Sequence, residues 1–165
     1  MEFAQPYLEQ MMGQLDLLSE EEKIMPENLY LYQPSHAAYD VRFGGRRDAK
    51  AIALLFQQAR DRLYPDGLTD GFYLMALADT LEKMDEQLYE HYRVLADLML
   101  EAARKALDSR DVRAHYALMK AVRLGLLDAE KYLPAAKKGF ENAQRTPQNA
   151  DFYRLALDEY GRIAQ

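Results

Sequence analysis

The sequence has 165 residues, of which 49% are hydrophobic and 29% are charged, a mixture typical of one globular domain spanning residues 1–165. Its formal net charge of −6 excludes the basic surface that nucleic-acid binding requires and disfavours attraction to anionic membranes. The absence of cysteine excludes disulfides, zinc–thiolate sites and a thiol nucleophile. The sequence also lacks a signal-peptide pattern and a membrane-spanning apolar run, so we expect a cytoplasmic protein.

Helical periodicity dominates the first part of the sequence. Apolar residues recur every three to four positions over residues 3–18, and the polar run at residues 19–22 is expected to end this helix. A second helix is expected over residues 26–41, where the pattern is weaker. Pro34 lies inside that window, and a proline in a helix interior removes a backbone hydrogen bond.

The same periodicity continues after the break at Gly44 and Gly45. It predicts helices over residues 47–64 and 70–84, and the wide apolar surface of the latter predicts a deeply buried helix with contacts on more than one side. Further helices are expected over residues 88–107, 112–127, 128–140 and 152–163. No stretch alternates between apolar and polar residues as a strand would.

These elements predict an all-α fold of about eight helices. The links between them are short, and a short link forces the next helix to turn back, so we expect consecutive antiparallel helical hairpins. Such hairpins are compatible with an α-solenoid, with part of an α/α toroid or with a compact bundle.

Residues that carry enzyme chemistry are sparse. None of the serines stands in a glycine-flanked nucleophile elbow, and His36, His91 and His115 lack the spacing of metal ligands. We therefore expect no metal site and no cofactor. Tyrosine stands out with 12 copies, and its ring can stack on a sugar or fill a helix interface while its hydroxyl reaches water.

Several stretches resemble segments of one enzyme family. Residues 70–82, DGFYLMALADTLE, are similar to the helix that follows the Asn-Gly-Trp motif of the unsaturated glucuronyl and rhamnogalacturonyl hydrolases. Residues 116–128 resemble a late helix of these enzymes with its Gly-Leu ending, and residues 135–140 resemble the following helix, which is rich in alanine and lysine. Residues 29–34, LYLYQP, are similar to a Leu-Phe-Met segment that ends in proline.

The resemblance implies a specific fold and activity. Members of the family form a toroid of twelve helices and hydrate the double bond of a 4,5-unsaturated uronic acid, using an aspartate as general acid and base and no metal. In this chain Glu27 falls at the position of the catalytic acid, which makes it the candidate catalytic residue. The candidate ligand contacts are Tyr30, Gln33, Asp70 and Tyr73.

The chain also departs from the family. A glutamate at position 27 moves the carboxyl group by one methylene, and small positioning errors can be costly in catalysis. The loop at residues 64–69 lacks the histidine, tryptophan and arginine of the family's substrate loop, and the chain has about half the family's length. We therefore expect a shortened relative that has lost hydration activity and retains carbohydrate binding or self-association, with a homodimer able to complete a ring; convergent helix packing is the alternative origin of the likeness.

A second functional hypothesis is a helical-repeat module that binds a protein partner. Its basis is the hairpin pattern, the tyrosine content and the eight methionines, which suit adaptable surfaces. A pocket lined by Tyr30, Tyr73 and a carboxylate would favour an oligosaccharide containing uronic acid as ligand. An open groove with an exposed apolar strip would instead favour a protein partner.

Overall fold

The computed structural model describes residues 4–63, 70–84 and 89–163, which form nine helices and no strand. The helices are α1 (Gln5–Asp16), α2 (Glu20–Lys23), α3 (Pro26–Arg42), α4 (Ala49–Leu63), α5 (Gly71–Lys83), α6 (Tyr89–Ala106), α7 (Val112–Arg123), α8 (Ala129–Asn142) and α9 (Ala150–Ile163). The loop at residues 64–69 and the expected helix start at Leu88 lie outside the described residues.

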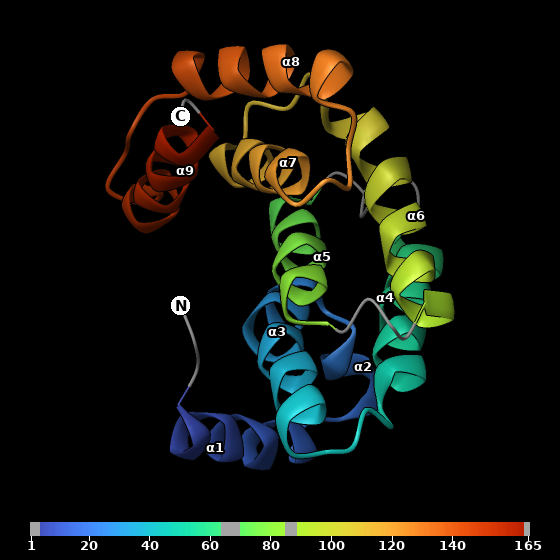
Figure 1. Cartoon of the computed structure of the whole chain (residues 1–165). Coiled ribbons are helices and arrows are strands. Elements are labelled where there is room, and N and C mark those ends of the chain that lie inside the picture. The colour runs from blue at the N-terminus through green and yellow to red at the C-terminus, as the bar shows by residue number, and fades with distance from the viewer. Residues whose placement is uncertain (1–3, 64–69, 85–88, 164–165) are drawn as a thin grey trace.

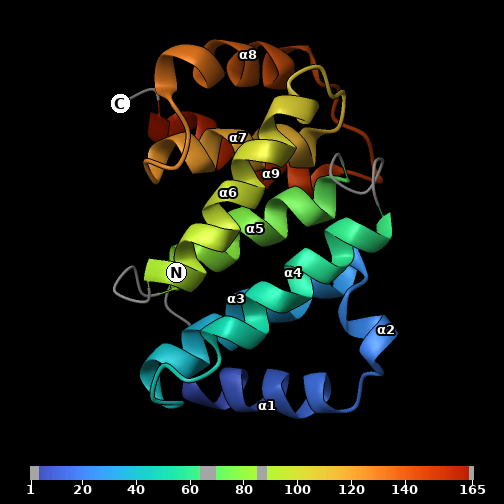
Figure 2. The same cartoon turned by 90° about the vertical axis from the view of Figure 1, so that its right-hand side faces the viewer.

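The helices form two layers that follow an open arc (Figure 1). The inner layer consists of α1, α3, α5, α7 and α9, each packed against the next, and the outer layer consists of α2, α4, α6 and α8. Figure 2 shows that α4 lies on the outer side of α3 and that α6 lies on the outer side of α5. The expected all-α fold of consecutive helical hairpins is confirmed.

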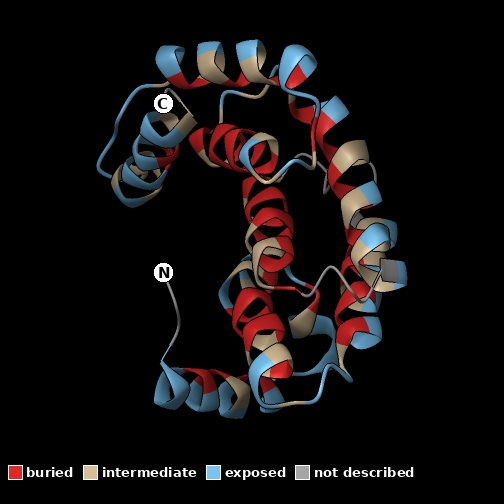
Figure 3. Cartoon of the chain, in the orientation of Figure 1, coloured by how far each residue is buried: buried red, intermediate tan, exposed pale blue. Residues whose placement is uncertain are grey.

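The centre of the core is formed by α5 and α7 (Figure 3). Helix α5 packs against α3, α6 and α7, as its wide apolar surface predicted, and it buries Tyr73, Leu74 and Met75. Helix α7 is buried to a similar extent and contributes Leu118 and Met119. Each fully buried side chain of this size stabilises the fold by about 1.5–3 kcal/mol, so this helix pair anchors the arc.

The polar run at residues 19–22 begins a helix, contrary to the expectation that it only ends one. The Ser19 hydroxyl accepts a hydrogen bond from the Glu22 amide at 3.1 Å, and the Glu22 carboxylate accepts one from the Ser19 amide at 3.0 Å. This capping box satisfies two backbone donors and starts the four-residue α2. Helix α2 accounts for the difference between the nine described helices and the eight expected.

Helix α3 continues through Pro34 without ending. A proline at this position removes one backbone hydrogen bond and costs about 3 kcal/mol. Packing against α1, α4 and α5 offsets this cost, because α3 buries residues along most of its length, Leu29 and Ala37 among them. Tertiary contacts therefore override the local preference against a helix.

Helix α7 ends at Arg123, earlier than the expected end at residue 127. Gly125 has a φ of +78°, the left-handed conformation that favours glycine. The Gly125 amide donates to the Val122 carbonyl at 3.0 Å, and the Leu126 amide donates to the Ala121 carbonyl at 2.9 Å. This pair of bonds is a Schellman motif, which terminates the helix.

Candidate functional site

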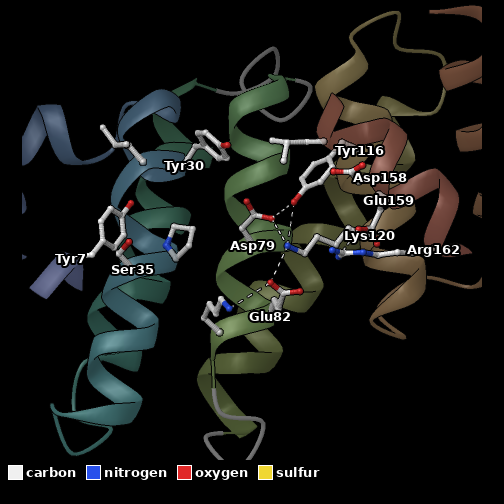
Figure 4. A pocket seen from close by; sticks show the side chains of 14 residues that line it. Tyr7, Tyr30, Ser35, Asp79, Glu82, Tyr116, Lys120, Asp158, Glu159 and Arg162 are labelled. Atoms are coloured by element: carbon white, nitrogen blue, oxygen red, sulfur yellow. Dashed lines mark hydrogen bonds and ion pairs between the residues drawn. The ribbon is translucent and has the colours of Figure 1, made fainter. Parts of the chain in front are cut away.

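A hollow of about 400 Å³ lies on the concave side of the arc, and every inner helix contributes to it (Figure 4). Its lining residues are Tyr7 from α1; Tyr30, Leu31, Pro34 and Ser35 from α3; Asp79, Glu82 and Lys83 from α5; Tyr116 and Lys120 from α7; and Leu155, Asp158, Glu159 and Arg162 from α9. Aromatic and aliphatic side chains stand beside charged ones, a combination typical of sites that bind polar ligands with apolar faces.

Asp79, Lys120 and Tyr116 form the polar centre of the hollow. Asp79 Oδ1 accepts hydrogen bonds from Lys120 Nζ at 2.6 Å and from the Tyr116 hydroxyl at 2.7 Å. Lys120 Nζ also donates to Glu82 Oε1 at 3.1 Å and to the Tyr116 hydroxyl oxygen at 3.2 Å. The Lys120 side chain is 7% exposed and the Asp79 side chain 18%, so the pair is largely shielded from water.

Helical spacing brings these groups to the hollow. Asp79 and Glu82 are three residues apart on α5, so both lie on one face of that helix. Tyr116, Lys120 and Arg123 follow one another at four and three residues on α7, which likewise places them on one face. Because α5 packs against α7, the two faces meet and their charges pair.

The ion pairs extend from this centre to α9. Arg123 Nη2 donates to Glu82 Oε2 at 3.3 Å, and the same guanidinium donates to the buried Glu159 carboxylate through Nε and Nη2. Arg162 Nη1 donates to Glu159 Oε2 at 3.5 Å. Acidic and basic groups therefore alternate from α5 through α7 to α9, joining three inner helices.

The environment of the hollow shifts several pKa values. Burial raises the pKa of Asp79, although Lys120 and Tyr116 both favour its ionised form. Burial and the neighbouring Asp79 raise the pKa of Tyr116 far above its usual value, so its hydroxyl remains a donor. Burial and Asp79 also raise the pKa of Tyr30 to about 12. For Glu82, burial acts to raise the pKa, but Lys120, Lys83 and Arg123 together lower it.

Two carboxylates retain acceptor capacity toward the hollow. Both hydrogen bonds to Asp79 end on Oδ1, and none from the described residues reaches Oδ2. In Figure 4 this second oxygen points away from Lys120, toward the side on which Tyr30 lies. Asp158 lines the hollow without a hydrogen bond or ion pair to any described residue. A ligand with hydroxyl groups can donate to both.

Of the residues predicted from sequence to bind a ligand, Tyr30 lines the hollow. Gln33 is fully buried, and its carbonyl oxygen lies 3.3 Å from His36 Nδ1. Tyr73 is buried in the core, where its hydroxyl donates to the Phe56 carbonyl at 3.0 Å. Glu27 is exposed in the first turn of α3 and is not part of the lining. Their functional roles remain predictions.

Asp70 is the N-cap of α5. Its Oδ1 accepts hydrogen bonds from the amides of Phe72 at 2.8 Å and Tyr73 at 3.4 Å. We expect Asp70→Ala to lower the free energy of unfolding by about 1 kcal/mol, because two amides lose their acceptor. Asp70→Asn keeps a capping oxygen and should stay close to the unaltered protein. Urea denaturation followed by circular dichroism measures both, and equal stability of Asp70→Ala and the unaltered protein would contradict the capping role.

An aromatic cluster holds the ring of Tyr30 at the edge of the hollow. The ring centroids of Phe72 and Phe152 lie 5.7 Å and 6.2 Å from that of Tyr30, and 5.5 Å from each other. The Arg113 guanidinium lies 4.2 Å from the Phe72 centroid and is bound by Asp111 through three hydrogen bonds. Phe72 from α5 and Phe152 from α9 thus hold the Tyr30 ring in place.

The polar centre was not predicted from the sequence. Asp79 and Lys120 lie within the two segments that resemble the hydrolases, yet 41 residues separate them, so spacing alone could not pair them. One signal was present: Lys120 is the one charged residue in an otherwise apolar run, residues 116–122. A charged residue at a buried position needs a partner, which is the property that could have identified it.

Two classes of site are not found in the described part of the chain. Its histidines, aspartates and glutamates form no group of three or more that could hold a metal ion. None of its helices combines the length and the apolar character needed to cross a membrane.

Comparison of the chain with protein-family models, with curated proteins and with solved structures finds no match. The likeness to the unsaturated uronyl hydrolases therefore rests on the sequence segments quoted above.

Proposed function

We propose that the protein binds an oligosaccharide in the concave hollow and does not catalyse hydration, as a shortened relative of the unsaturated uronyl hydrolases. The observation that carries this proposal is the composition of the hollow. Tyr7, Tyr30 and Tyr116 come from three different helices and stand beside Asp79 and other carboxylates. Sugars present C–H faces and hydroxyl groups, which match aromatic rings and carboxylate acceptors respectively.

The position of Glu27 supports binding without hydration. General acid catalysis requires the acid within hydrogen-bond reach of the reacting group. Glu27 is exposed at the start of α3, whereas the carboxylates of the hollow, Asp79 and Glu82, lie on α5 and are bound to Lys120. The candidate acid thus stands apart from the residues that line the proposed binding site.

Isothermal titration calorimetry with a panel of plant tetrasaccharides, including cellotetraose and tetragalacturonate, tests the proposal. We expect at least one to bind with a dissociation constant below about 1 mM, equivalent to about −4 kcal/mol. Tyr7→Ala should weaken that binding about fivefold by removing a stacking surface. Tyr39→Ala is the matched control, because the Tyr39 ring contacts that of Phe43 at a centroid distance of 5.6 Å and does not line the hollow.

An unsaturated uronyl disaccharide serves as substrate in the second part of the same test. Its absorbance should remain constant with the purified protein, since the proposed function excludes hydration. Steady loss of this absorbance would overturn the non-catalytic part of the proposal, and its abolition in Glu27→Gln would then identify Glu27 as the acid. No binding by any member of the panel would overturn the carbohydrate-binding part.

A specific observation favours a protein partner as the second candidate. Three apolar side chains that line the hollow are substantially exposed: Tyr7 by 41%, Leu31 by 45% and Leu155 by 37%. They come from α1, α3 and α9, so both walls of the hollow offer apolar surface to an amphipathic helix. Unlike an oligosaccharide, such a partner would depend on Leu31 and Leu155 more strongly than on Asp79.

Self-association belongs to the same proposal. Helices α1 and α9 form the two ends of the inner layer and lie at the opening of the arc (Figure 1). Two arcs joined at these ends would enclose the hollow. The expected homodimer remains a prediction.

A further inference from the structure

We infer that the hollow selects an uncharged saccharide, which donates hydroxyl hydrogen bonds to Asp79 and Asp158, over a saccharide that carries uronate groups. This inference rests on the proposed carbohydrate binding and concerns the charge of the ligand. It follows from which groups of the hollow are already paired and which are still able to bind.

The central base of the hollow has no donor left for a ligand carboxylate. An ammonium group has three N–H donors. Lys120 directs one to Asp79 at 2.6 Å, one to Glu82 at 3.1 Å and one to the Tyr116 oxygen at 3.2 Å. A uronate could reach Lys120 only by breaking one of these bonds, and breaking the bond to Asp79 would leave that largely shielded carboxylate without a basic partner among the described residues.

The other bases that line the hollow also stand beside carboxylates. Lys83 Nζ lies 3.9 Å from Glu82 Oε1. Arg162 is the most exposed base, but it contacts Glu159 at 3.5 Å and lies one helical turn from Asp158. A uronate bound at Arg162 would therefore face two protein carboxylates, and like charges at short range repel.

The groups that remain able to bind are acceptors. Asp79 Oδ2 and the Asp158 carboxylate receive no hydrogen bond from the described residues. A sugar hydroxyl can donate to either, whereas an ionised carboxylate has no proton to donate. Of the described lining residues four are acidic and three are basic, and the whole chain carries a formal charge of −6. Both the local and the overall field therefore disfavour a polyanion.

Two matched ligand pairs test the inference by calorimetry. Tetragalacturonate is compared with its methyl ester, which keeps the linkage and stereochemistry but removes the charge. Cellotetraose is compared with its C6-oxidised form, which adds the charge to a neutral chain. In at least one pair the uncharged member should bind about tenfold more tightly or better, the effect expected for one hydrogen bond to a charged acceptor.

Asp79→Asn adds a sharper readout. The amide oxygen can still accept from Lys120 and Tyr116, so the amide nitrogen replaces the open acceptor with a donor. Binding of the uncharged ligand should fall about tenfold, and binding of the uronate should stay equal or improve. Asp97→Asn, on the exposed surface of α6 away from the hollow, is the control and should change neither.

Asp158→Asn covers the case in which Asp79→Asn does not fold, because Asp158 is exposed. It should weaken binding of the uncharged ligand about threefold and leave thermal unfolding unchanged. Equal or tighter binding of the uronate in both pairs would overturn the inference while leaving carbohydrate binding intact, and loss of that binding in Arg162→Gln would identify Arg162 as the base that holds the uronate. Failure of all four ligands to bind would overturn the inference and the proposed function together.

Discussion

Replacing Lys120 by methionine is expected to lower the free energy of unfolding by about 3–5 kcal/mol at neutral pH. Methionine fills a similar volume but removes the one base among the described residues that pairs with Asp79, whereas Glu82 keeps Arg123 and Lys83. Removing one partner of a shielded ion pair leaves the other charge buried without compensation, which costs more than the pair itself contributes. Urea denaturation at pH 7 measures the loss.

The deficit of Lys120→Met should shrink as the pH falls. Burial already raises the pKa of Asp79, and loss of Lys120 removes an interaction that lowers it. A carboxyl group whose pKa is higher in the folded than in the unfolded state stabilises the fold at low pH, and this stabilisation is lost as pH rises through the folded-state pKa. The variant should therefore lie closer to the unaltered protein at pH 4.5 than at pH 7.

A double variant separates charge from packing. Asp79→Asn in the Lys120→Met background removes the uncompensated carboxylate, so it should recover part of the lost stability at pH 7. A loss below about 1 kcal/mol in Lys120→Met, or a loss that does not change with pH, would contradict the role assigned to this ion pair.

Gly139→Ala is expected to lower the free energy of unfolding by about 2–3 kcal/mol. Gly139 lies within α8, and a Cβ atom there would overlap the imidazole ring of His115 on α7. The ring cannot easily move, because His115 is fully buried and its Nε2 lies 2.5 Å from the Ser109 carbonyl oxygen. The substitution must therefore displace α8 from α7.

Gly161→Ala is the matched control for this effect. Gly161 also lies within a helix, α9, but a Cβ atom at this position would meet no other atom within 4 Å. Alanine is the better helix former, so this variant should match or exceed the stability of the unaltered protein, by up to about 1 kcal/mol. Thermal unfolding of both variants makes the comparison, and unchanged stability in Gly139→Ala would show that α7 and α8 do not require this close approach.

Periodicity predicted the helices well because most of them bury one continuous stripe. Local signals account for the two differences from prediction, which are the additional helix α2 and the early end of α7. Ser19 and Glu22 satisfy each other's backbone amides and start α2, which is too short to show a periodic pattern. Gly125 ends α7 although apolar residues continue to Leu127, because backbone geometry rather than hydrophobicity closes the helix. A capping box and a Schellman motif can both be recognised in sequence once they are sought.

The hollow was harder to predict because its lining residues come from five helices. Sequence similarity nominated Tyr30, which does line the hollow, together with Gln33 and Tyr73, which are buried. Tyrosine fills cores and lines pockets with the same ring, so its presence in a helix does not distinguish the two roles. Asp79 and Lys120 are 41 residues apart in the sequence and form their ion pair only because α5 packs against α7.

The central claim is that an oligosaccharide occupies the concave hollow, and methyl NMR tests it most directly. With leucine methyl groups labelled, the tetrasaccharide that binds most tightly in calorimetry is added to the protein. The signals of Leu31 and Leu155, which line the hollow, should shift, while that of Leu54, exposed on the outer helix α4, should not. Binding that shifts Leu54 and leaves Leu31 and Leu155 unchanged would contradict the claim.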